Sequence, residues 1–149
     1  MSGRAGVPID DGRCFACGPE NPIGMHLQFE DLGEQGVRAQ TTLAPEFQGW
    51  RGIAHGGIAI SLLDEAMAHA AGYAGHRGVT ASMNIRFRRP VPLGTELVIC
   101  GRVAWQRGKV LGIEADVYDD GGTLLLHGDG HFISAGAVGD AVDRRNPGA

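Results

Sequence analysis

The stretch "HGGIAISLLDE", from His55 to Glu65, combines groups that could polarise a carbonyl and move a proton with residues typical of a buried helix. Gly56 and Gly57 precede an apolar segment, so their backbone N–H groups have no side-chain cover at a helix N-terminus. Such N–H groups favour negative charge and can polarise a carbonyl oxygen that approaches closely. Asp64, further along the same segment, offers a carboxylate for general base or nucleophilic chemistry.

Helical geometry separates this acid from its neighbour. At about 100° per residue the apolar side chains form one broad arc. The arc contains Ala59, Ile60, Leu62, Leu63, Ala66, Met67 and Ala70. Asp64 lies just beyond one edge of the arc, whereas Glu65 lies further round, near Ser61 and His69. Asp64 is therefore the better candidate for catalysis, and the simpler alternative is a polar residue at the rim of an amphipathic helix.

His55 precedes Asp64 by nine residues, so the two side chains would point to opposite sides of one helix. We therefore expect His55 to orient the turn or to cap the helix, and not to form a dyad with Asp64 within one chain. The same spacing suggests that the glycine N–H donors of one chain face Asp64 of another. We expect a homodimer or a dimer of dimers.

The surrounding pattern predicts an α+β fold with one helix, from Gly57 to about Gly72, among five or six strands. The clearest strand is Val79–Arg88, in which Val79, Ala81, Met83, Ile85 and Phe87 alternate with a polar row that begins at Thr80. Tight turns at Arg107-Gly108 and at Asp119–Gly122 join later strands. Short turns between consecutive strands indicate an antiparallel sheet. Since only one good helix can cover its apolar face, we expect a central helix wrapped by the sheet.

Length and composition indicate one domain. The 149 residues suit a single core, with a mobile arm over 1–13, one domain over 14–135 and a flexible tail over 136–149. A net charge of −4 argues against a nucleic-acid partner. We expect no membrane partner, because no apolar run approaches the length of a membrane span. The polar opening has no signal-peptide pattern and the three cysteines give no disulfide framework, so a cytoplasmic location is expected.

At "HGGIAISLLDEA" the sequence resembles the hotdog-fold acyl-CoA thioesterases, the superfamily of 4-hydroxybenzoyl-CoA and phenylacetate-type thioesterases. The stretches "CFACGPENPIGMHLQF", "FQGWRGIAHGG" and "MNIRFRRPVPLG" fit the same group in order. The resemblance implies the hotdog fold, an antiparallel sheet around one long helix. It also implies hydrolysis of an acyl-CoA thioester without a cofactor, at sites that lie between two subunits.

Residue roles follow from the same resemblance. The Gly56 N–H, alone or together with that of Gly57, would polarise the thioester carbonyl, and Asp64 would activate water or attack as nucleophile. A Ser or Thr on the strand after the helix often assists the carboxylate, and Thr80 matches that position. Some relatives carry an amide side chain six residues before the histidine, where this sequence has Gly49. That contact is missing or supplied elsewhere.

The densest positive cluster in this acidic chain is Arg86, Arg88 and Arg89. Arginine suits the phosphates of coenzyme A, so these residues are candidates for substrate binding; a solvated strand end is an equal alternative. Two other functions stay open. One is a non-catalytic acyl-CoA-binding or regulatory hotdog module, and the other is a hydratase, for which no recognisable motif is present.

Cys14 and Cys17 form a CxxC motif. A zinc site would need two more ligands, and the sequence offers only Cys100 and scattered histidines, with no second CxxC. We therefore interpret the motif as a turn. Glu65 and His69 form an i,i+4 pair that needs no metal, so no metal site is expected.

Overall fold

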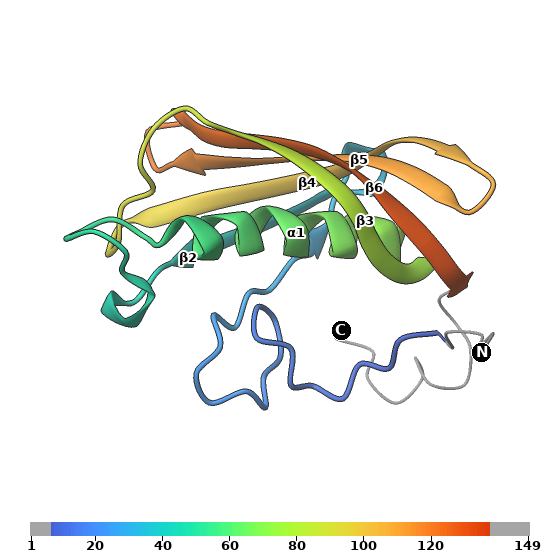
Figure 1. The fold of residues 1–149 in the computed structure, drawn as a ribbon, viewed down its shortest axis with the longest axis horizontal. Coiled ribbons are helices and arrows are strands. Elements are labelled where there is room, and N and C mark those ends of the chain that lie inside the picture. The colour runs from blue at the N-terminus through green and yellow to red at the C-terminus, as the bar shows by residue number, and fades with distance from the viewer. Residues whose placement is uncertain (1–6, 138–149) are drawn as a thin grey trace.

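The computed structural model describes residues 7–137, which form one long helix and one six-stranded sheet (Figure 1). The elements are β1 (Glu30–Asp31), β2 (Val37–Thr42), α1 (Gly56–Tyr73), β3 (His76–Phe87), β4 (Glu96–Arg107), β5 (Val110–Asp119) and β6 (Leu124–Ala137), with 3-10 turns at Gly33–Gln35 and Pro45–Phe47. The strand order is β1-β2-β4-β5-β6-β3, and every neighbouring pair is antiparallel. The predicted architecture, an antiparallel sheet around one helix, is confirmed.

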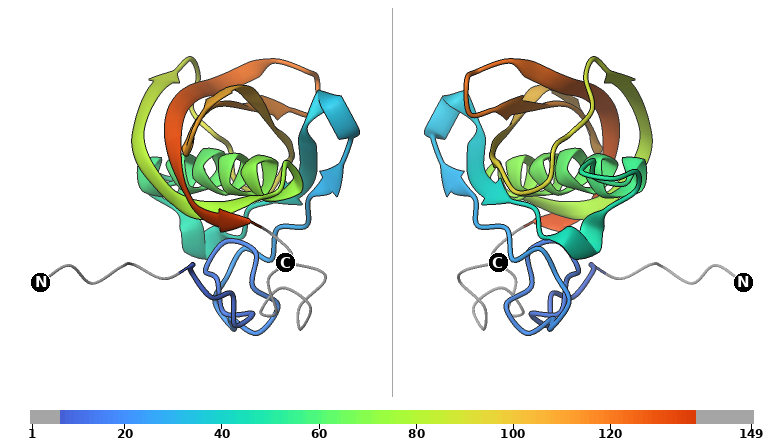
Figure 2. Two further views of the ribbon diagram at one scale, coloured as in Figure 1. Left: turned by 90° about the vertical axis from the view of Figure 1, so that its right-hand side faces the viewer. Right: turned by 90° about the vertical axis from the view of Figure 1, so that its left-hand side faces the viewer.

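The sheet curves over α1, as the end-on views show (Figure 2). The helix buries a face of small and medium apolar side chains against it: Ala59, Leu62, Leu63, Ala66, Met67, Ala70 and Ala71. Helix and sheet approach closely at Gly101 of β4, where a Cβ atom would lie 2.6 Å from the Ala66 carbonyl oxygen. The small residues on both elements let the sheet wrap around the helix.

The N-terminal segment lies on the side of α1 that the sheet leaves open (Figure 2). It folds back on itself through Met25 N–H to Phe15 O and Leu27 N–H to Ala16 O, both 2.9 Å. Ala16, Met25 and Leu27 are buried and extend the core. Residues 1–6 and 138–149 fall outside the described residues, so the proposed arm and tail stay predictions.

One prediction about β3 is wrong. Strict alternation placed Thr80 opposite the apolar row, yet its side chain reaches α1, while Val79 is 58% exposed. The cause is a register shift between Thr80 and Ser82 in the pairing with β6. The irregularity inserts one extra residue and reverses the alternation, so that Thr80 lies on the same face as Met83.

No helix within residues 7–137 is both long and apolar enough to cross a membrane. The cellular location stays a prediction.

Candidate functional site

The middle of α1 presents Asp64 to strand β3. Thr80 Oγ1 donates a hydrogen bond to Asp64 Oδ1 at 2.6 Å, and both side chains are partly buried. The bulge after Thr80 makes this contact possible, because it turns the hydroxyl toward the helix. Within the described residues Asp64 Oδ2 accepts no hydrogen bond. The arrangement orients the carboxylate and leaves one oxygen able to accept a proton.

The start of α1 carries the histidine and the two glycines. His55 caps the helix, as expected: its Nδ1 accepts the Gly57 N–H at 2.9 Å, and its carbonyl oxygen accepts from Ile58 N–H at 2.9 Å. The Gly57 donor is thereby engaged. The Gly56 N–H has no acceptor among residues 7–137, and a Cβ atom at Gly56 would meet nothing within 4 Å. Gly56 is therefore the donor that a ligand can reach.

Gly56 and Asp64 do not meet within one chain. They are eight residues apart on a regular helix, which is about 12 Å along the axis at 1.5 Å per residue. A carbonyl group whose oxygen lay on the Gly56 N–H could not have its carbon beside Asp64 of the same chain. The structure thus brings Thr80 to Asp64 but keeps the two halves of the predicted site apart.

The three arginines lie at the end of β3 nearest the start of α1. Arg86 is in the strand, and the backbone N–H groups of Arg88 and Arg89 donate to Leu125 O at 2.8 and 3.0 Å. All three side chains are exposed and make no hydrogen bond or ion pair within the described part of the chain. The following loop contacts the segment before the helix, through Ala54 N–H to Val91 O at 2.8 Å. This contact connects the loop after the arginines to the Gly56 end of the helix.

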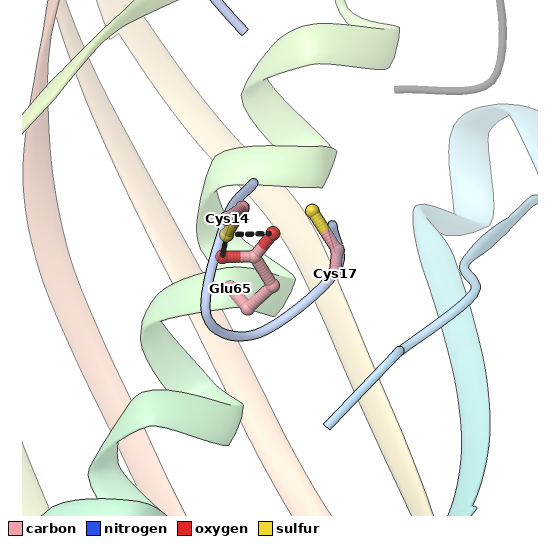
Figure 3. Close-up of side chains that lie close together, drawn as sticks. All are labelled: Cys14, Cys17 and Glu65. Atoms are coloured by element: carbon pink, nitrogen blue, oxygen red, sulfur yellow. Dashed lines mark hydrogen bonds between the residues drawn. The ribbon is translucent and has the colours of Figure 1, made fainter. Parts of the chain in front are cut away.

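A second constellation occupies another side of α1, and sequence reasoning missed it. Figure 3 shows the sulfur atoms of Cys14 and Cys17 beside the carboxylate of Glu65; we call these three residues the thiol–carboxylate cluster. Cys14 Sγ lies 3.7 Å from both carboxylate oxygens, and one ligand atom from each of the three residues lies within 4.8 Å of the others. His69 Nε2 donates to Glu65 Oε1 at 3.1 Å. The motif at 14–17 and the pair at 65–69 are far apart in sequence, so no local pattern joins them.

Burial and hydrogen bonding set the charges in this cluster. Burial raises the pKa of the Cys17 thiol far above its usual range, and the adjacent Glu65 carboxylate raises it further. Burial would also raise the pKa of Glu65, but hydrogen bonds from His69 and Cys17 outweigh it, so that the pKa of Glu65 lies below its usual range. The cluster therefore holds an ionised carboxylate beside a protonated thiol.

A long helix wrapped by an antiparallel sheet is the architecture of the hotdog fold. A sequence model of the thioesterase superfamily matches residues 51–126, half of the chain. The chain belongs to this superfamily.

Individual relatives support the assignment to this superfamily. The acyl-coenzyme A thioesterase THEM4 of Bos taurus is 30% identical over 127 residues, which cover 84% of this chain and 52% of THEM4. The chain thus spans about half the length of that relative. A crystal structure of a thioesterase superfamily protein has a TM-score of 0.77 at 30% identity and covers 80% of this chain and 62% of its own.

More distant structures share the fold. A Streptococcus mutans protein bound to acetyl CoA has a TM-score of 0.72 at 18% identity, with coverage of 80% of this chain and 96% of its own. The PaaI protein of E. coli, from the phenylacetic acid degradation operon, has a TM-score of 0.70 at 20% identity, with coverage of 76% and 82%.

Proposed function

We propose that this protein hydrolyses the thioester bond of an acyl-CoA, at a site that two copies of the chain share. The observation that carries the proposal is the 2.6 Å hydrogen bond from Thr80 to Asp64, within a chain of the thioesterase superfamily. It supplies an oriented carboxylate with one oxygen that accepts no hydrogen bond from residues 7–137, and a general base requires such an oxygen.

The reaction follows from these positions. The Gly56 N–H donates to the thioester carbonyl oxygen, and Asp64 takes a proton from a water molecule as that water attacks the carbonyl carbon. The tetrahedral intermediate places negative charge on the former carbonyl oxygen, where the N–H and the helix N-terminus stabilise it. Collapse breaks the C–S bond, and the proton passes to the CoA thiolate. The products are a carboxylic acid and free CoA.

Two chains are needed because Gly56 and Asp64 are about 12 Å apart along one helix. A partner chain that supplies Gly56 opposite Asp64 completes the site twice per homodimer. Exposed apolar side chains agree with a covered surface: Val79, next to Thr80, is 58% exposed, and Trp50, before the helix, is 83% exposed. The dimer of dimers expected from the sequence is the larger assembly compatible with this arrangement.

Relatives support the substrate class. THEM4 is an acyl-CoA thioesterase, and neighbours from Streptococcus mutans and Streptococcus pneumoniae were solved with acetyl CoA and with coenzyme A. The Streptococcus pneumoniae protein was also solved with single alanine replacements of a threonine and of an aspartate, and these positions have the spacing of Thr80 and Asp64. The exposed side chains of Arg86, Arg88 and Arg89 would bind the CoA phosphates, which agrees with their position near the Gly56 end of the helix.

The experiment that tests the proposal measures free CoA with a thiol reagent across acyl-CoAs from acetyl to aryl and long-chain. Hydrolysis of at least one, lost in Asp64→Asn, is the expected result. Binding of acyl-CoA without release of CoA from any substrate would instead identify a non-catalytic acyl-CoA-binding module. Hydration of an enoyl-CoA without CoA release would identify a hydratase.

A further inference from the structure

We propose that Cys14, Cys17 and Glu65 bind a divalent metal ion of the zinc class, which fastens the N-terminal segment to helix α1. This site is separate from the Asp64–Thr80 pair, and the proposed hydrolysis does not depend on it. The sequence alone led us to expect no metal, because it did not show that Glu65 and the CxxC motif face each other.

The spacing of the donor atoms fits a tetrahedral ion. Zn–S bonds of about 2.3 Å and Zn–O bonds of about 2.1 Å, at the tetrahedral angle, place a sulfur and an oxygen roughly 3.6 Å apart. Cys14 Sγ lies 3.7 Å from each oxygen of Glu65. One ligand atom from each of the three residues lies within 4.8 Å of the others, so small side-chain adjustments bring all three onto one ion. Figure 3 shows both sulfurs on the same side of the turn, pointing at the carboxylate.

A backbone hydrogen bond closes the turn that carries the two cysteines. Gly18 N–H donates to Cys14 O at 2.8 Å, which closes the turn around the motif. A Cβ atom at Gly18 would lie 2.3 Å from Cys14 N, so only glycine fits there. Hydrogen bonds between residues 15–16 and 25–27 then hold the turn against the core. The two cysteines are thereby aimed together at one point on α1.

Glu65 is prepared as a ligand by its neighbours. Its side chain is only 13% exposed, and His69, one turn further along α1, donates to Oε1 at 3.1 Å. The His69 ring stacks on Phe29 with centroids 4.6 Å apart, which fixes its orientation. A hydrogen bond from a fixed partner that orients a ligating carboxylate is the usual outer-shell arrangement of metal sites. His69 is thus a positioning residue.

The fourth coordination position faces a cavity of about 590 Å³. Cys14, Cys17, Glu65 and His69 line it together with Asp10, Asp11 and His76. The cavity gives an ion a path of entry, and a water molecule there completes a tetrahedral set. Two thiolates and a carboxylate form a soft, anionic donor set, which favours zinc over magnesium or calcium. Binding replaces the two thiol protons by the metal, and those protons pass to solvent.

The direct test measures bound metal in the reduced full-length protein. We expect one equivalent of zinc per chain after purification, or after anaerobic addition of Zn²⁺ to chelator-treated protein. Replacement by Co²⁺ should give a thiolate-to-cobalt charge-transfer band and the visible bands of a tetrahedral site. Absence of bound metal in the folded, reduced protein would overturn the proposal.

The zinc affinity of single variants distinguishes the proposed ligands from other residues. Loss of an outer-shell partner typically weakens metal affinity by about 10–100-fold, and we expect this range for His69→Gln. A larger loss of zinc affinity is expected for the ligand variants Cys14→Ser, Cys17→Ser and Glu65→Gln. Cys100→Ser is the matched control, because this cysteine lies in β4, outside the cluster, and should leave the bound metal unchanged. Equal metal content in the cysteine and control variants would overturn the site.

The competing outcome is a redox role for Cys14 and Cys17. A separate measurement is needed for the case in which the cysteine variants do not fold. A Cys14–Cys17 disulfide, found by mass spectrometry in protein kept with a reductant, would overturn metal binding. Should the cysteine variants fail to fold, a thiol-blocking reagent added to the wild-type protein should release one zinc into a colorimetric chelator. Release of none would also overturn the proposal.

Discussion

Asp64 and Glu65 are neighbours on α1, yet they serve two different regions of the molecule. One residue turns the helix by about 100°, so Asp64 meets the Thr80 hydroxyl of β3 while Glu65 meets the N-terminal cysteines. Asp64 keeps an oxygen without a partner within the described residues. Glu65 is enclosed by two sulfurs and a histidine. The difference shows that a carboxylate's partners, and not its place in the sequence, decide whether it is available for proton transfer.

Substitution of Asp64 should have the largest effect on activity. Asp64→Asn keeps the size of the side chain and its contact with Thr80 but removes the base, so kcat should fall by about 10²–10⁴-fold. Glu65→Gln should leave kcat within about twofold, measured by release of CoA in zinc-supplemented buffer. Circular dichroism checks that both variants fold. Wild-type turnover in Asp64→Asn would remove this residue from the mechanism.

Sharing of the site between chains predicts complementation. Asp64→Asn and Gly56→Pro, which removes the N–H donor, should each be inactive alone. After random subunit exchange, half of the dimers are mixed and each rebuilds one of two sites, so activity should recover to about a quarter of wild type. No recovery, with mixed dimers verified by mass spectrometry and Gly56→Pro shown to fold, would place the whole site within one chain.

Thr80 provides a second test of the difference between the two acids, because it donates a hydrogen bond to Asp64 and not to Glu65. Thr80→Val is nearly isosteric and removes a hydrogen bond to a charged group, so kcat should fall by about tenfold, the low end of what such bonds contribute. Ser82→Ala is the control on the same strand, since its hydroxyl contacts His131 on the exposed surface. Unchanged kinetics with a lower Tm would make Thr80 a structural residue.

The Glu65 region should respond to metal instead. At zinc a hundredfold above its Kd, the folded state gains about 2.7 kcal/mol, which is roughly 5–10 °C in Tm for a chain of this size. Removal of zinc with a chelator should lower the Tm of wild type and of Asp64→Asn equally, and that of Glu65→Gln hardly at all. Scanning fluorimetry measures all three, and the same shift in Glu65→Gln would contradict the assignment.

The smallest effects are expected for the arginines, whose exposed side chains lie at the end of β3. Arg88→Ala and Arg89→Ala should each raise KM for an acyl-CoA about two- to fivefold, as expected for exposed charge pairs, with little change in kcat. An acyl-N-acetylcysteamine thioester, which lacks the CoA phosphates, should be unaffected. Equal damage to both substrates would mean that these residues support the fold or an interface.

Local sequence patterns determined the architecture. The helix was predicted from Gly57 to about Gly72 and runs over Gly56–Tyr73, and the turns at Arg107-Gly108 and Asp119–Gly122 join the strands as expected. Capping was one of the two roles predicted for His55. These features depend on side-chain periodicity and turn chemistry within a few residues, so they can be inferred before any tertiary contact is known.

Only the tertiary structure decided the surroundings of the two acids. Whether Thr80 faces the helix depends on a bulge against β6, and strand alternation by itself predicts the opposite face. Cys14 and Glu65 are 51 residues apart and meet because the N-terminal segment closes the side of α1 that the sheet leaves open. Long-range packing of this kind has no local signal in the sequence, because it follows from which surfaces remain uncovered once the sheet has wrapped the helix.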